Sequence, residues 1–198
     1  MYDWYLPVMM CLSLHEGNRP PEDIDDAAFA KLKKSLFSLS PQMAGMGQWA
    51  SVFSQLTNEE FWVMPGVGAW AALLLENDGV PVKAVVPKEG GLQWTESLSI
   101  AANSKKKDLA TKLIQYLVSP EGQMREATKA SYWASIPSKA GWKKLNADMP
   151  KAAVRLEHTF DKRNVMDEFK EGKIFIRDIP TQQSIEDWNE AWTEFKNM

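Results

Sequence analysis

Apolar and polar residues alternate with a helical period over much of the chain, and this pattern predicts a series of helices. Phe29, Leu32 and Leu36 recur at helical spacing, so we expect an amphipathic helix there that is capped by Asp25 or Asp26. Further helices are expected at residues 3–14, 48–56, 69–77, 104–117, 151–160 and 182–195, and another is expected to begin at residue 120.

Several of these helices begin with residues that favour a helix start. Asp3 and Ser104 are candidate N-caps, and Ser119 followed by Pro120 is the favoured arrangement of cap and first helical residue. Thr181 is the expected cap of the last helix. That helix carries an apolar stripe, which predicts a face that packs against the rest of the protein: Ile185, Trp188, Trp192 and Phe195.

Three short apolar segments predict strands, at residues 61–64, 82–86 and 98–102. The second is rich in β-branched residues. Because a helix at residues 69–77 lies between the first two, the order predicts a right-handed parallel crossover. The expected fold class is therefore α/β.

The composition is that of a globular protein with room for a proper core: 198 residues, 44% hydrophobic and 25% charged, with a formal net charge of −3. One compact domain or two small lobes would fit this length. Slight acidity and the lack of a basic block argue against nucleic acid as a partner. The one lysine cluster, Lys105 to Lys107, is expected to be a solvated helix face.

Catalytic, metal and cofactor chemistry have little support in the sequence. Cys11 is the sole cysteine and is expected to be a buried small hydrophobe. His15 and His158 have no metal-ligand spacing, so we expect no metal and no cofactor. Glu96 and Asp178 would form a hydrolase pair only if the fold brought them together. The chain is therefore expected not to be an enzyme.

The most informative segment runs from residue 87 to residue 123 and reads PKEGGLQWTESLSIAANSKKKDLATKLIQYLVSPEGQ. It resembles the two-lobed solute-binding proteins of ABC importers, most closely the spermidine/putrescine-binding family. The resemblance implies a fold like that of type II periplasmic binding proteins, mostly the second lobe with a segment of the first. In that scheme residues 1–95 form the main part of lobe two, residues 96–140 belong to lobe one, and residues 141–198 return to lobe two.

Trp94 and Glu96 are the leading candidates for solute contacts. On an extended segment they project from the same face, and an indole beside a carboxylate suits an organic cation. The resemblance implies the same roles, although its pattern has Asp where this chain has the longer Glu96. Without the surrounding motif, an edge-strand tryptophan beside a solvated glutamate would be the better interpretation.

The resemblance also implies roles for Tyr132, which precedes a proline-containing loop, and for Asp3, which matches an amine-binding acid at a helix start. Trp133 is expected to share or replace the role of Tyr132. The family's C-terminal part contributes a glutamine to its ligand, and residues 172–178 of this chain contain none. That contact is expected to be lost.

Gly66 and Gly68 lie in a turn before an expected helix, where backbone amides favour an anionic group. The sequence fits the dinucleotide pattern G-x-G-x-x-A, with Glu89 about twenty residues onward. Glu89 falls in a turn and the surrounding topology is too short, so a solute-facing turn is favoured over a nucleotide site. This turn lacks the aromatic contact of the polyamine family and leaves room for a solute with an anionic end.

The resulting hypothesis is an extracytoplasmic solute-binding component of an ABC transporter. It would bind a small organic, polyamine-like solute with a cationic group and present it to a membrane permease. Alternatives are a binding protein for an anionic or zwitterionic molecule, or a hydrolase with a Trp-lined pocket. A periplasmic or membrane-anchored extracellular location is expected, although the chain carries no signal peptide, and the resemblance implies that the first lobe's leading half is absent. Exposed apolar surface on the lobe-one segment would favour a homodimer.

Overall fold

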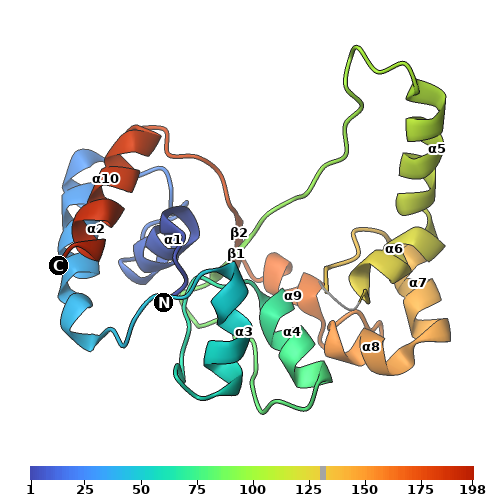
Figure 1. The fold of residues 1–198 in the computed structure, drawn as a ribbon, viewed down its shortest axis with the longest axis horizontal. Coiled ribbons are helices and arrows are strands. Elements are labelled where there is room, and N and C mark those ends of the chain that lie inside the picture. The colour runs from blue at the N-terminus through green and yellow to red at the C-terminus, as the bar shows by residue number, and fades with distance from the viewer. Residues whose placement is uncertain (130–132) are drawn as a thin grey trace. The chain divides into compact units, whose positions relative to one another are not determined.

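The structure is a computed structural model that describes residues 1–129 and 133–198. The chain divides into two compact units (Figure 1). The first unit comprises residues 1–69, 84–94 and 169–198, and the second comprises residues 70–83 and 95–168. Among the described residues, no helix has both the length and the apolar content that crossing a bilayer requires.

Three helices build the core of the first unit: α1 (Tyr5–His15), α2 (Asp26–Ser38) and α10 (Ile185–Lys196). Figure 1 shows them packed side by side, and their apolar faces meet in one cluster of buried side chains. Its members include Met9, Met10, Leu32, Leu36, Trp188, Trp192 and Phe195. A short 3₁₀ turn (Ser40–Gln42) and α3 (Trp49–Thr57) complete the helices of this unit. The expected helices at residues 26–36 and 48–56 are confirmed.

The apolar stripe of α10 packs into this core, as its spacing predicts, with Trp188, Trp192 and Phe195 buried. Ile185 is the exception, because it lies at the first position of the helix and stays exposed. The cap is Ser184, not the expected Thr181. Thr181 instead donates a hydrogen bond to Asp23 at 2.6 Å, so its hydroxyl joins two distant segments.

Two of the predicted helix caps are confirmed, and two others are not. Asp25 accepts from the Ala28 N–H at 2.8 Å, and Ser119 accepts from the Gly122 N–H at 3.1 Å. Asp3 is not a cap, since α1 is preceded by Trp4 and has no side-chain cap. The cap predicted at Ser104 is also displaced, because α5 begins three residues later at Lys107.

The sheet consists of two three-residue strands, β1 (Gly91–Gln93) and β2 (Ile174–Ile176), which pair in parallel. The three strands predicted at residues 61–64, 82–86 and 98–102 were wrong, because none of these segments pairs with another. The β-preference of valine reflects packing on a half-buried sheet, and Val85 is 79% exposed. The parallel pairing therefore joins two other segments of the chain.

The second unit is helical. It contains α4 (Ala69–Asn77) from its second residue onward, α5 (Lys107–Leu117), α6 (Pro120–Ala127), α7 (Lys139–Asp148), α8 (Pro150–Arg155) and most of α9 (Val165–Lys170). Helix α4 has the bounds that the sequence predicts. Helix α8 ends five residues before its predicted end, because Glu157 adopts a left-handed φ of 56°. The Glu157 N–H donates to the Val154 carbonyl and the His158 N–H donates to the Ala153 carbonyl, which closes the helix.

Two further expectations concern Cys11 and the lysine cluster. Cys11 is half-buried, and its burial raises the pKa of its thiol to about 11. Lys105, Lys106 and Lys107 are exposed, which confirms a solvated face. No side chain of α5 is buried, and its apolar residues Leu109 and Leu113 are 65% and 58% exposed.

Candidate functional site

Trp94 and Arg177 each follow one of the two parallel strands. Gln93 pairs with Ile176 at the last step of the sheet register, so the next residues lie side by side at its carboxyl edge. The Arg177 N–H extends the ladder by donating to the Gln93 carbonyl at 2.7 Å. The carboxyl edge of parallel strands is the usual position of ligands in open α/β sheets. This edge is therefore the candidate site.

The guanidinium of Arg177 lies against two indole rings. Its Cζ atom is 4.4 Å from the centroid of Trp4 and 5.4 Å from the centroid of Trp94. Both distances are within the range of favourable cation–π contacts. Trp4 is the residue before α1 and is 40% exposed. We call Trp4, Trp94 and Arg177 the Arg177 clamp.

One nitrogen of the clamp has no hydrogen-bond partner. The Nη1 atom of Arg177 is out of contact with solvent and donates to no acceptor among the described residues. Nor does Arg177 form an ion pair with any carboxylate in the described part of the chain. An unpaired buried donor on a charged group is costly. The clamp therefore presents a cation with unused hydrogen-bonding capacity.

Arg177 was not identified from the sequence. It lies in the segment of residues 172–178, where the resemblance points only to a missing glutamine. The arginine directly after the apolar stretch Ile174 to Ile176 was a usable signal, but its aromatic partners are remote in the sequence. Only the parallel register brings Arg177 beside Trp94.

The other leading candidate, Glu96, lies two residues along the chain from Trp94. Trp94 is the last residue of its segment in the first unit, whereas Glu96 is exposed and belongs to the second unit. A shared role for Trp94 and Glu96 stays a prediction. Tyr132 lies outside the described residues, and Trp133 is buried with Arg155 over its ring at 5.1 Å.

Asp3 has partners within the first unit. Its carboxylate accepts two hydrogen bonds from the Lys196 ammonium, at 2.7 and 2.9 Å, and one from Trp192 Nε1 at 3.0 Å. Burial alone would raise the pKa of Asp3, but these hydrogen bonds and the lysine charge outweigh it and lower the pKa below the usual value. This carboxylate links α10 to the chain before α1.

The glycine turn before α4 is a tight packing element. Gly66 has a left-handed φ of 84°, and a Cβ there would lie 2.2 Å from the Cγ2 atom of Val8. This close approach requires glycine. Gly68 stands directly before Ala69, the first residue of α4. The segment ahead of the turn is not the expected strand, so an anion-binding role for Gly66 and Gly68 stays a prediction.

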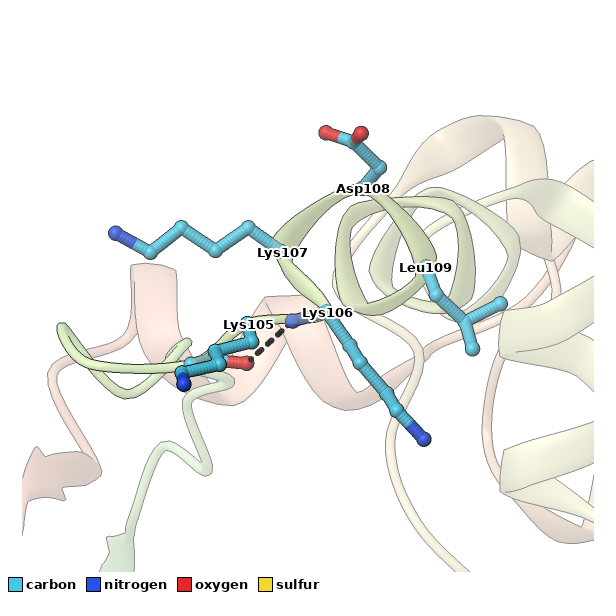
Figure 2. Close-up of a pocket in the computed structure, with 6 residues that line it drawn as sticks. Lys105, Lys106, Lys107, Asp108 and Leu109 are labelled. Carbon is cyan, nitrogen blue, oxygen red and sulfur yellow. Dashed lines mark hydrogen bonds between the residues drawn. The ribbon is translucent and has the colours of Figure 1, made fainter.

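Two hollows occur elsewhere on the described surface. The first is lined by Ser104 to Leu109, and Figure 2 shows Lys106 and Lys107 extending in different directions, so their ammonium groups do not converge on a ligand. The second is mainly apolar and is lined in part by Met43, Met46, Phe195 and Met198. No three His, Cys, Asp or Glu side chains in the described ranges are grouped to hold a metal ion.

Comparison with known proteins agrees with the resemblance described from the sequence. Residues 1–153 match the family described as bacterial extracellular solute-binding protein. The spermidine/putrescine-binding periplasmic proteins of Salmonella typhimurium and Escherichia coli K12 are each 31% identical to the chain over 135 residues. These alignments cover 68% of this chain but only 36% of each relative, so the chain spans about a third of their length. No solved structure matches the chain.

Proposed function

The chain belongs to the family of bacterial extracellular solute-binding proteins, and we propose that it acts in the solute-binding component of an ABC importer. The family implies the periplasmic binding protein fold and a location outside the cytoplasm. Binding is the family's activity, so no catalytic step is assigned. The assignment of residues 1–95 and 141–198 to lobe two and of residues 96–140 to lobe one stays part of this proposal, as does delivery to a membrane permease.

The proposed cargo is a small organic solute with a cationic group. The observation that carries this proposal is the position of Trp94, an aromatic ring at the carboxyl edge of the two parallel strands. A ring presented in this way suits a solute that is partly apolar and charged. The names of the relatives support a polyamine-like cargo. Glu96 and Tyr132 remain the proposed contacts for the cationic group and for a solute hydrogen bond.

A second candidate is a zwitterionic or anionic solute. The observation that favours it is the unpaired Nη1 atom of Arg177, which needs an acceptor that a polyamine lacks. Both candidates use the same aromatic residues and differ in the charge that the solute carries.

Isothermal titration calorimetry with putrescine and spermidine tests the proposed function. Trp94→Leu is expected to weaken solute binding at least tenfold, because it removes the aromatic face of the clamp. Trp62→Leu is the matched control, since Trp62 is 86% exposed and belongs to no part of the clamp. Equal affinity of both variants for a bound solute would contradict the assignment of Trp94.

We also propose self-association through α5. The described surface that fits this proposal consists of exposed apolar residues of α5 and of the residue that follows it: Leu109, Leu113, Tyr116 and Val118. Sedimentation velocity over a range of concentrations should reveal a dimer, and Leu109→Gln with Leu113→Gln should shift it to monomer. Lys112→Gln, on the same helix, serves as the control. A wild-type chain that stays monomeric at high concentration would contradict the dimer.

A further inference from the structure

Building on the proposed function, we propose that the solute carries a carboxylate that binds the guanidinium of Arg177. The preferred ligand class is then an amino carboxylate, with a cationic and an anionic end, in place of a simple diamine. Arg177 would be the residue that sets this preference.

The first reason is that the aromatic rings of the clamp already hold a cation. Arg177 lies 4.4 Å from Trp4 and 5.4 Å from Trp94, so the chain itself supplies the positive charge for both rings. An ammonium group entering the same site would meet a like charge at short range, and partial burial strengthens that repulsion. A dication is therefore disfavoured here unless it displaces Arg177.

The second reason is that Arg177 has no ion-pair partner in the described part of its unit. Asp178, the next residue in the chain, accepts a hydrogen bond from the Ile179 N–H at 2.8 Å, and Asp3 is held by Lys196 and Trp192. Arg177 pairs with no carboxylate among the described residues. Its Nη1 atom also has no acceptor. A carboxylate brought by the solute would supply the missing ion-pair partner of the guanidinium.

The third reason is the partial positive charge at the beginning of α1. Trp4 leads directly into α1, which has no side-chain cap and no acidic residue in its first turn. The beginning of an uncapped helix carries partial positive charge from its free N–H groups. It therefore adds to the preference that Arg177 creates and supplies nothing that would neutralise a bound cation.

Guanidinium geometry then selects the anion. Arginine presents parallel N–H donors that match the two oxygens of a carboxylate, and such charge-assisted pairs are the stronger hydrogen bonds in proteins. The indole rings on Arg177 restrict its orientation, so less rotational freedom is lost on binding. A planar carboxylate is thus a better fit than an ammonium group.

A matched ligand pair tests the proposal by calorimetry: 5-aminopentanoate and 1,5-diaminopentane, which have the same chain length and differ at one end. The wild-type chain is expected to bind the amino carboxylate at least tenfold tighter. Arg177→Gln should remove this preference, and Arg177→Lys should keep part of it because the charge remains. Near-ultraviolet circular dichroism checks that each variant is folded, and the wild-type preference decides the matter if a variant is not.

The outcomes separate this proposal from the proposed function. Diamine binding that depends on Trp94 but is tighter than amino-carboxylate binding, and unchanged in Arg177→Gln, would overturn the role of Arg177 and leave a solute-binding function in place. Failure of both ligands, and of the polyamines, to bind would overturn the proposed function and this proposal with it. Tenfold preference for the amino carboxylate that Arg177→Gln abolishes would support both.

Discussion

Trp94 and Arg177 stand at matching positions after the two parallel strands, and the guanidinium carbon of Arg177 lies 5.4 Å from the Trp94 ring centroid. The backbone positions both side chains, because Arg177 N–H also bonds the Gln93 carbonyl. Within the described residues the sheet has two strands of three residues, and it assembles the charged and aromatic group of the candidate site.

The clamp is expected to couple Arg177 energetically to its two rings. A double-mutant cycle with Arg177→Gln and Trp4→Leu should give a coupling free energy of about 0.5–1 kcal/mol, and the longer contact to Trp94 should give less. Urea unfolding of the four proteins in each cycle measures this. Trp62→Leu, at an exposed position, is expected to show no coupling to Arg177. A coupling within error of zero for Trp4 would mean that the contact adds nothing to stability.

The ion pair of Asp3 is expected to stabilise the first unit. Asp3→Asn should cost about 1–3 kcal/mol at pH 7, because it weakens charge-assisted hydrogen bonds from Lys196 and leaves α10 less firmly attached. The pKa of Asp3 is lowered in the folded protein, so its contribution is present above the ordinary value of 3.8 and is lost as the pH falls through the folded value.

Urea unfolding at pH 7 and near pH 3 checks this sign. The wild type and Asp3→Asn should differ at pH 7 and approach each other at the lower pH. Asp148→Asn is the control, since its pair with Lys144 lies at the surface and should contribute at most about 1 kcal/mol. Equal stabilities of wild type and Asp3→Asn at pH 7 would leave solute binding as the better explanation for this carboxylate.

His158 makes the second unit sensitive to acid. Its side chain is fully buried, and its Nε2 atom accepts a hydrogen bond from the Ile136 N–H at 2.9 Å. Its ring stacks on Trp142 with centroids 4.4 Å apart. Burial lowers the pKa of His158 from 6.5 to about 4. The unfolded chain therefore binds a proton that the folded chain excludes as the pH falls from about 6.5 to 4, and about 3 kcal/mol of stability is lost across that window.

His158→Gln should flatten the pH dependence of stability between about pH 6.5 and 4. The same substitution should lower stability at neutral pH, because it disturbs the stack with Trp142. Denaturant midpoints between pH 4 and pH 7 provide the measurement. His15→Gln is the control, because the His15 side chain is 67% exposed. This variant should still lose stability toward acid. A wild-type stability that is level across the window would show that His158 titrates alike in the folded and unfolded chain.

Gly66 should tolerate no side chain. Gly66→Ala combines a left-handed φ with a Cβ that would lie 2.2 Å from Val8, and we expect a loss of about 2–4 kcal/mol. Gly79 is a matched control, because its φ of 85° is nearly the same and a Cβ there would meet nothing within 4 Å. Gly79→Ala should cost only about 1 kcal/mol. Thermal unfolding compares the two, and equal losses would mean that the contact with Val8 relaxes freely.

The sequence by itself determined the features that depend on neighbouring residues. Asp25 and Ser119 cap their helices because each side chain reaches a backbone N–H three residues away. The stripe of Trp188, Trp192 and Phe195 packs into the core because a 3.6-residue period places these side chains on one face. The segment around Trp94 likewise indicated the family that the comparison found.

Only the tertiary structure decided the features that need a partner from elsewhere in the chain. A strand requires a second strand, so valine-rich residues 82–86 stayed unpaired while Gly91 to Gln93 found Ile174 to Ile176. The carboxylate of Asp3, expected to cap a helix, is held by Lys196 from the far end of the chain. Arg177 joins Trp4 and Trp94 for the same reason, because contacts between residues distant in sequence are set by strand register and helix packing and leave no periodic signal in the sequence.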